Sequence, residues 1–510
     1  MAILGNFIKT AIELKEKLTP ETEAIPAQER VLRQLLKTAE NTEFGQRYGF
    51  YKILSADNPR KAFAATVPIH DYQKIQDEWW HRVQAGEENI TWPGKPQYFA
   101  LSSGTTGSSS KRIPVTDEML DAIRTTGVQQ VTSLANFDMP PEFFEKEIMM
   151  LGSSTDLQKR GEFLEGEISG ISASNIPFWF KGYYRPGDDI ARIADWDERV
   201  QKIAERAEEW DIGALSGIPS WMELMMKKVI EYHNLKNIHE IWPNLSVYTP
   251  GGVAFEPYRK SFERLLDHPL IYLDTYLASE GFLAFQNRPD TTSMALVVDN
   301  GIYFEFVPFE EKNMAEDGNV HPDAEILTLA EVEEEQDYVL LISTVSGAWR
   351  YMIGDTVKFT DKERGEIAIT GRTKHFLNVV GSQLSVHKMN AAMQKLEEHF
   401  QVTIPEFTVA AVRREEDQEY IHKWYLGSDD AMNAEEVAET LDKILKDANK
   451  NYGVARSKAL KDVKVEVIPS DLFYQWSEVS KKKGGQVKTP RVMKEEEFAE
   501  WEAFVQKARV

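Results

Sequence analysis

The stretch from Ser102 to Lys111 most constrains how this chain folds, because it places nine small residues before a cation. Gly104 and Gly107 allow the backbone to bend so that several N–H groups converge on one anion. Apolar residues precede and follow the stretch, which predicts a loop inside a domain. A flexible Ser/Gly linker between domains is the alternative.

The hydroxyl and N–H groups of this loop are suited to hold a phosphate chain. Its spacing differs from the common phosphate loop, since Ser109 stands five residues after Gly104 and no Gly-Lys pair follows. A kinase or GTPase of the common type is therefore not expected.

Three later segments carry groups that suit a nucleotide. Tyr276, Ser279 and Glu280 follow an apolar run, and an aromatic ring can cover a purine while a carboxylate can hold Mg²⁺. The run from Tyr248 to Val253 looks like a strand that ends in glycines, where a flat ligand can approach the backbone closely. Asp355 follows Gly354, and its carboxylate could accept both ribose hydroxyls. Taken alone, each of the first two segments also fits an ordinary strand end.

Together, in this order, these segments resemble the adenylate-forming superfamily of acyl-CoA synthetases and luciferases. They resemble more closely the auxin-responsive Gretchen Hagen family of acyl-acid amido synthetases. The similarity rests on the Ser-Ser-Gly-Thr-Thr-Gly loop, Tyr276 with Ser279-Glu280, and Arg350-Tyr351 before Gly354-Asp355. It extends to Asn41 to Phe50 and to a near-terminal Gln-x-Lys-x-Pro-Arg motif that contains Lys488, and so runs from about residue 30 to about residue 495.

The resemblance implies that the chain activates a carboxylic acid with ATP and then transfers the acyl group to an amine, such as an amino acid. It implies Mg²⁺ bound by Glu280, ribose held by Asp355 and Arg372, and Lys488 reaching the reacting groups from a mobile C-terminal domain. The implied catalytic residues are Lys488, Glu280 and Arg372. The implied nucleotide-binding residues are Ser102, Ser103, Gly104, Thr105, Thr106, Gly107, Gly252, Val253, Tyr276, Ser279, Asp355 and Arg372.

The acid-binding pocket is the least readable part of the sequence. Trp179 and Trp221 are bulky apolar candidates, although plain core packing also explains each of them. Transfer to coenzyme A is the main alternative to an amine acceptor, with a basic cluster at Lys481 to Lys483 as its possible signal. A nucleotide-binding protein without catalysis is a third hypothesis. The acid, the amine, the hinge residue and the oligomeric state stay open.

Composition narrows the classes of protein. The 510 residues are 42% hydrophobic and should form more than one domain. The chain has no cysteine, which excludes disulfides and a cysteine nucleophile and suits the cytoplasm. The net charge of −23 argues against a nucleic-acid partner, and no run approaches the roughly 20 apolar residues of a membrane span.

Element patterns predict an α/β fold with a large N-terminal domain, residues 1–380, and a small α+β C-terminal domain, residues 381–510. Strand-like and helical runs alternate in the first part, and Tyr303 to Pro308 with Glu325 to Thr328 indicates antiparallel, barrel-like material. The predicted C-terminal order is a helix at Val386 to Phe400, strands at Phe407 to Arg413 and Tyr420 to Leu426, a helix at Ala434 to Asn449 and a strand at Val463 to Ile468.

Overall fold

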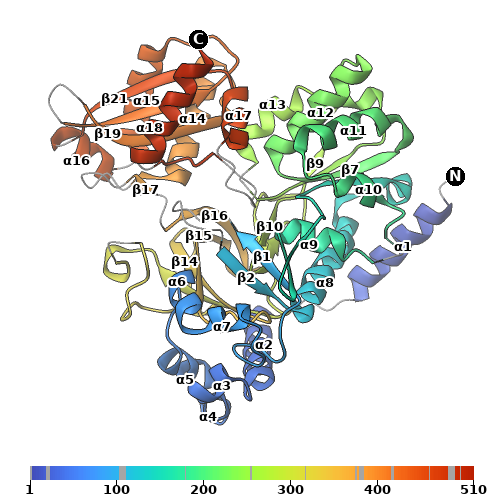
Figure 1. Ribbon diagram of the computed structural model, residues 1–510, viewed down its shortest axis with the longest axis vertical. Coiled ribbons are helices and arrows are strands. Elements are labelled where there is room, and N and C mark those ends of the chain that lie inside the picture. Colours follow the sequence, from blue (N-terminus) through green and yellow to red (C-terminus); the bar gives the residue numbers. More distant parts are fainter. Residues whose placement is uncertain are drawn as a thin grey trace. The chain divides into compact units, whose positions relative to one another are not determined.

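The computed structural model confirms a mixed α/β fold with several sheets (Figure 1). It describes residues 3–18, 23–102, 111–177, 180–252, 255–315, 318–373, 376–377, 384–414, 419–448, 450–458, 460–479, 489–493 and 495–509. The chain divides into an N-terminal unit, residues 1–255 and 263–369, and a C-terminal unit, residues 256–262 and 370–510. The predicted boundary between residues 380 and 381 falls outside the described residues and stays a prediction.

The N-terminal unit contains a five-stranded parallel sheet in the order β6-β3-β7-β8-β9. Its strands are β3 (Glu147–Leu151), β6 (Tyr184–Arg185), β7 (Ile212–Gly217), β8 (Val247–Pro250) and β9 (Ile271–Tyr272). Helices alternate with these strands, as parallel crossovers require. They are α9 (Ile168–Ser174), α10 (Asp188–Ala191), α11 (Trp196–Arg206), α12 (Pro219–His233) and α13 (Arg259–Glu263), whose first four residues belong to the C-terminal unit.

Helix α11 shows how local sequence sets these elements. The Asp195 side chain accepts a hydrogen bond of 2.8 Å from the Glu198 amide and caps the N-terminus. Val200, Ile203 and Ala204 are buried at helical spacing, while charged residues cover the exposed side. The helix ends at Arg206, and a short 3-10 turn from Ala207 to Glu209 continues it.

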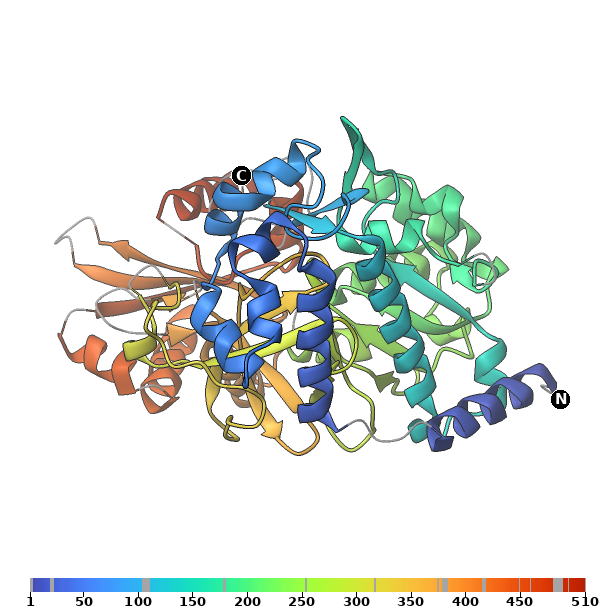
Figure 2. The ribbon, with the colours of Figure 1, turned by 90° about the horizontal axis from the view of Figure 1, so that it is seen from below.

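The second sheet of the N-terminal unit has four strands in the order β2-β1-β5-β4. They are β1 (Tyr98–Ser102), β2 (Lys111–Val115), β4 (Gln158–Arg160) and β5 (Phe163–Gly166). β1 runs antiparallel to β2 and parallel to β5. Helix α8 (Asp117–Ser133) follows β2 and contacts α1 (Ile3–Leu18), and the two are seen from another side in Figure 2.

The largest sheet has seven strands in the order β10-β11-β12-β16-β15-β14-β13, and its described pairings are antiparallel. The strands are β10 (Thr275–Ala278), β11 (Gly281–Phe285), β12 (Met294–Leu296), β13 (Ile302–Pro308), β14 (Asp337–Thr344), β15 (Tyr351–Asp361) and β16 (Glu366–Arg372). The helices α2 (Ala24–Ala39), α3 (Glu43–Arg47), α4 (Phe50–Leu54), α5 (Pro59–Thr66), α6 (Tyr72–Ile75) and α7 (His81–Gln84) lie together beside it (Figure 1). Tyr303 and Trp349 join these helices to the sheet in one apolar cluster.

The segment from Glu325 to Thr328 differs from the strand that the sequence predicts. It makes one antiparallel bridge, between Phe306 and Leu327. Two of its backbone amides donate to side chains instead of to a neighbouring strand, Glu325 to the Asn313 side chain and Thr328 to Glu331. A ladder therefore cannot extend from the bridge.

The C-terminal unit is an α+β layer structure. Its central sheet has the order β19-β20-β21, with β19 (Glu406–Arg413) antiparallel to β20 (Tyr420–Gly427) and β20 parallel to β21 (Leu460–Ile468). Side chains alternate along each strand, so that Trp424 packs into one apolar cluster and Tyr425 into another. Helices α14 (Val386–Phe400), α15 (Ala434–Ala448) and α16 (Lys450–Lys458) supply the first cluster, and α17 (Asp471–Val479) and α18 (Glu495–Ala508) the second. The short strands β17 (Phe376–Leu377) and β18 (Leu384–Ser385) pair with each other.

Candidate active site

The small-residue loop connects two paired strands of one sheet. Ser102, the last residue of β1, stands opposite Lys111, the first residue of β2. This register excludes a linker between domains, because both flanks belong to the same hairpin. Ser103, Gly104, Thr105, Thr106 and Gly107 lie outside the described residues, so their predicted roles stay predictions.

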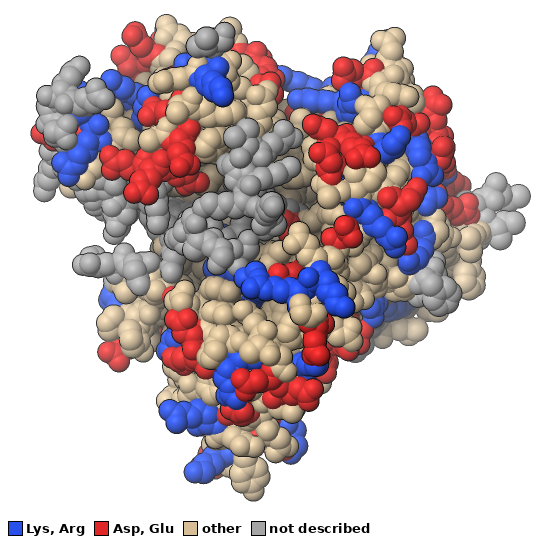
Figure 3. Space-filling model, viewed as in Figure 1, with Lys and Arg blue, Asp and Glu red and all other residues tan. Residues whose placement is uncertain are grey.

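Basic side chains gather at the start of β2. Lys111 Nζ lies 5.4 Å from the centre of the Tyr72 ring, and the Arg112 amide donates to the Tyr72 hydroxyl at 2.9 Å. Arg112 Nε donates to Glu165 at 2.8 Å. Figure 3 shows Lys and Arg side chains in a row over β1 and β2, on a face where acidic and basic groups otherwise alternate. Positive charge is therefore concentrated beside the loop, as an anionic protein that binds phosphates requires.

The glycine segment after β8 lies next to the start of β10. Thr275 Oγ1 donates a hydrogen bond of 2.7 Å to the Pro250 carbonyl oxygen. A Cβ added at Gly251 would stand 3.1 Å from Thr275 Oγ1, so the approach leaves little room for a side chain. Gly252 has a φ of 80°, a left-handed conformation that favours glycine. Val253 lies outside the described residues.

A second hydrogen bond joins β10 to β15. The hydroxyl of Tyr276 donates to Asp355 Oδ2 at 2.6 Å, across 79 positions of sequence. Three strands separate β10 from β15 in the sheet, so a flat sheet would hold them about 19 Å apart. The sheet therefore curls, which agrees with the barrel-like material that the sequence predicts. Pro250, Tyr276 and Asp355, which belong to three separate sequence segments, come together within the N-terminal unit.

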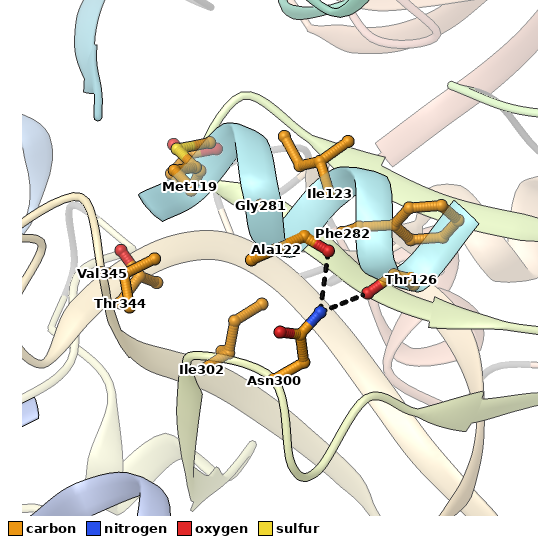
Figure 4. A pocket seen from close by; sticks show the side chains of 11 residues that line it. Met119, Ala122, Ile123, Thr126, Gly281, Phe282, Asn300, Ile302, Thr344 and Val345 are labelled. Carbon is orange, nitrogen blue, oxygen red and sulfur yellow. Dashed lines mark hydrogen bonds between the residues drawn. The ribbon is translucent and has the colours of Figure 1, made fainter. Parts of the chain in front are cut away.

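The turn Ser279-Glu280 closes the hairpin of β10 and β11, and it buries a carboxylate. Glu280 is only 6% exposed, while Ser279 is half-buried. Glu280 lines a small pocket together with apolar side chains of α8, β11 and β13 (Figure 4). The Asn300 amide spans this pocket and donates to the Ala122 carbonyl at 2.7 Å and to Thr126 Oγ1 at 2.9 Å. A buried carboxylate at a tight turn is well placed to bind a cation.

Arg350, which belongs to the sequence motif, makes buried contacts within the fold. Its Nε donates to Glu305 at 2.9 Å, and both side chains are buried. Its Nη1 donates to the carbonyls of Ala64 in α5 and Val67 directly after that helix, at 2.8 and 2.7 Å. Burial raises the pKa of Glu305, against the opposing charge of Arg350. Arg350 therefore fixes the start of β15, five residues before Asp355.

Of the remaining predicted residues, the structure describes Arg372 and Trp221. Arg372 is half-buried at the end of β16 and belongs to the C-terminal unit. Trp221, in the first turn of α12, packs edge-on against Trp196 with ring centres 4.1 Å apart. Lys488 and Trp179 lie outside the described residues.

Metal-ligand clusters and membrane-spanning helices are both absent from the described part of the chain. In that part, no three His, Cys, Asp or Glu side chains form a group that could hold a metal ion. Mg²⁺ is usually bound by one or two carboxylates together with substrate phosphates, so Glu280 alone fits that pattern. None of the described helices is both long and apolar enough to cross a bilayer.

The family models that match this chain, and two relatives that resemble it in sequence, belong to one family. The GH3 family N-terminal domain matches residues 14–201, the GH3 family central domain residues 295–372 and the GH3 family C-terminal domain residues 387–497. The jasmonoyl–L-amino acid synthetase GH3.5 of Oryza sativa subsp. japonica is 23% identical, over 92% of each chain. The indole-3-acetic acid-amido synthetase GH3.4 of Arabidopsis thaliana is 21% identical, over 94% of this chain and 91% of the relative.

Solved structures share the fold. The GH3.15 acyl acid amido synthetase superposes with a TM-score of 0.79 at 17% identity, over 97% of this chain and 96% of the other. A 2-hydroxyisobutyryl-CoA ligase in the postadenylation state has a TM-score of 0.56 at 13% identity, over 95% of this chain and 92% of the other. The fold is thus that of the adenylate-forming enzymes. Because the three consecutive GH3 domain models together match more than half of its residues, the chain belongs to the GH3 family.

Proposed function

We propose that this chain is an ATP-dependent acyl acid amido synthetase. The observation that carries the proposal is the pair of hydrogen bonds, Thr275 to Pro250 and Tyr276 to Asp355, which joins three nucleotide-type segments in a member of the GH3 family. The named relatives conjugate jasmonic or indole-3-acetic acid, whereas the substrates of this chain are a small carboxylic acid and an amino acid that remain to be identified.

The first half-reaction is adenylation. One oxygen of the acid's carboxylate attacks the α-phosphorus of ATP, a new P–O bond forms, and pyrophosphate leaves with the electrons of the broken P–O bond. In the second half-reaction the neutral amine attacks the acyl carbon, the C–O bond to AMP breaks, and the amine loses a proton. Positioning and charge neutralisation supply most of the rate enhancement in such chemistry.

Each residue has a role in this proposal. The Tyr276 ring covers the adenine while its hydroxyl orients the Asp355 carboxylate toward the ribose, which Arg372 also holds. The backbone at Gly252 and Val253 forms the other side of the adenine site, and Ser279 supplies a hydroxyl beside it. The loop from Ser102 to Gly107 binds the phosphates.

Two charged residues act at the reacting groups. Lys488 contacts the α-phosphate or the carboxylate during adenylation. Glu280 holds Mg²⁺, which would neutralise phosphate charge when bound, and the burial of its carboxylate fits that role. Trp221 and Trp179 contact the acid.

The reaction is tested in two stages. Acids are screened one by one for ATP–pyrophosphate exchange, which reports adenylation alone. The best acid is then incubated with ATP, pooled amino acids and coenzyme A, and the products are separated by mass. An acyl-amide is expected, and an acyl-thioester in its place would show a coenzyme A ligase. Fractionation of the source cells should place the protein in the cytoplasm, where ATP is supplied.

Variants of Asp355 test the nucleotide site. Asp355→Asn removes the charge that accepts the Tyr276 hydroxyl, and it should raise the KM for ATP by about 10-fold or more. Asp337→Asn, at an exposed position on the neighbouring strand β14, is the matched control and should leave that KM unchanged. Equal effects of the two substitutions would contradict the proposed ribose contact.

A further inference from the structure

Arg199, on helix α11, is a buried arginine without a carboxylate partner. The residue is 4% exposed, and its Nε is buried without a hydrogen-bond acceptor. In the part of the chain that the structure describes, its guanidinium makes no hydrogen bond and no ion pair. A guanidinium cannot lose its proton in a protein, so burial without an anion is costly.

Other arginines of the N-terminal unit have the carboxylate partner that Arg199 lacks. Arg350 is equally buried and pairs with Glu305 at 2.9 Å. Arg206, two turns farther along α11, is partly exposed and still contacts Asp189 and Glu209 at 2.9 and 3.0 Å. Arg199 therefore keeps a charge inside the fold that no described side chain neutralises at close range.

The guanidinium of Arg199 lies over one indole ring. Its Cζ lies 5.2 Å from the centre of the Trp196 ring, which packs edge-on against Trp221. Burial lowers the pKa of Arg199, while Tyr184 and Glu167 act on it electrostatically in the opposite sense. The carboxylate of Glu167 itself accepts a hydrogen bond from Ser153 at the carboxyl end of β3. A cation beside one indole ring, with a second indole packed on the first, offers both charge and apolar surface to an organic carboxylate.

We propose that Arg199 binds a carboxylate of a substrate, with Trp196 and Trp221 against the apolar part of the same molecule. The identity of that substrate rests on the proposed function. Three sources share this chemistry: the carboxylate that is adenylated, a second carboxylate on the acid, and the α-carboxylate of the acceptor amino acid. In the last case Glu167, whose negative charge acts on Arg199, would be the partner of the ammonium group.

Kinetics of Arg199→Met distinguish the three sources. Loss of a charge-assisted contact should raise one KM by about 10- to 100-fold. The affected KM is that for every acid in pyrophosphate exchange if the reacting carboxylate is bound, and that for dicarboxylic acids alone if a second carboxylate is bound. It is the KM for the amino acid in amide formation if the acceptor is bound. Amino acid amides lack the α-carboxylate, so the variant and the unmodified protein should then have the same KM for them. Arg199→Lys should have an intermediate effect, because it keeps the charge without the planar fork.

Unfolding of the free protein supplies a second measurement that does not require activity. Arg199→Met removes an uncompensated buried charge, so its Tm should equal or exceed that of the unmodified protein. Arg206→Met, on the same helix, is the matched control and should leave every KM and the response to ligands unchanged. Amino acids, their amides, benzoate and succinate are added singly, and at least one carboxylate should raise the Tm of the unmodified protein but not that of Arg199→Met.

Two results would overturn the proposal. One is a clearly lower Tm for Arg199→Met together with unchanged KM values, which would make Arg199 a structural residue. The other is an equal ligand-induced rise of Tm in the variant and the unmodified protein. Absence of pyrophosphate exchange with every acid would contradict the proposed function instead, and the Tm comparison would still decide the role of Arg199.

Discussion

Replacing Arg350 by Met should cost this protein about 3–5 kcal/mol of unfolding free energy, the range for breaking one side of a buried ion pair. The variant leaves the Glu305 carboxylate buried without its 2.9 Å partner. It also removes the donor that the carbonyls of Ala64 and Val67 share. Urea unfolding, followed by tryptophan fluorescence because Trp349 packs in the adjacent cluster, measures the loss.

The loss should depend on pH in a stated direction. Burial raises the pKa of Glu305 and Arg350 opposes that shift, so removing Arg350 raises the pKa further. The folded variant then binds a proton more tightly than the unfolded chain does, and its stability falls as the pH rises through the raised pKa. The deficit of Arg350→Met should therefore be larger at pH 8 than at pH 5.

Two further variants control this experiment. The double variant Glu305→Met with Arg350→Met removes both charges and should recover more than half of the loss, since apolar replacement of a buried pair is often neutral. Arg364→Met breaks a largely exposed pair with Asp361 and should cost less than about 1 kcal/mol. The reasoning is refuted if the double variant is no more stable than Arg350→Met, or if the deficit of Arg350→Met is the same at both pH values.

Three other predictions concern single groups. Tyr276→Phe removes the 2.6 Å hydrogen bond to Asp355 and should raise the KM for ATP by about 3- to 10-fold with little change in Tm, as steady-state kinetics will show. Glu280→Gln should slow pyrophosphate exchange by about 10²–10³-fold, and an Mg²⁺ titration that restores no activity would favour a structural role. The buried ring of His70 donates from Nδ1 to the Trp349 carbonyl at 2.8 Å, and burial lowers its pKa to about 4. Between pH 6.5 and pH 4 the unfolded chain therefore binds a proton that the folded protein does not, so the free energy of unfolding decreases as the pH is lowered. His70→Gln should remove part of this decrease, as urea titrations at several pH values will show.

Local patterns predicted much of the fold. The helix from Val386 to Phe400 has the predicted bounds, and the two strands that follow it each begin within one residue of the prediction. Apolar spacing predicts the helix, and short, nearly continuous apolar runs predict the strands, whose two faces are both packed. The antiparallel barrel-like strand from Tyr303 to Pro308 is confirmed for the same reason, starting one residue earlier.

Hydrogen bonds between polar groups far apart in the chain could not be predicted from the sequence. The ring of Tyr276 suggests a contact with adenine, but nothing near it in the sequence indicates that its hydroxyl meets Asp355, 79 positions away. Arg199 stands among acidic neighbours that suggest a solvent-facing helix. The one available signal is its spacing, since it falls on the same face as Trp196 and Ile203, both of which are buried.

The division of the chain into two units also limits how this protein can be recombined. The backbone passes from one unit to the other three times, because residues 256–262 leave the N-terminal unit and return to it. Within the C-terminal unit the Tyr258 hydroxyl donates to Glu406 at 2.5 Å, and Arg491 donates to the same carboxylate at 2.7 Å. A fragment that starts at residue 370 would lack this tyrosine and leave its acceptor short of one donor. Domain exchange between relatives should therefore transplant residues 256–262 together with residues 370–510, as a module that is discontinuous in the gene.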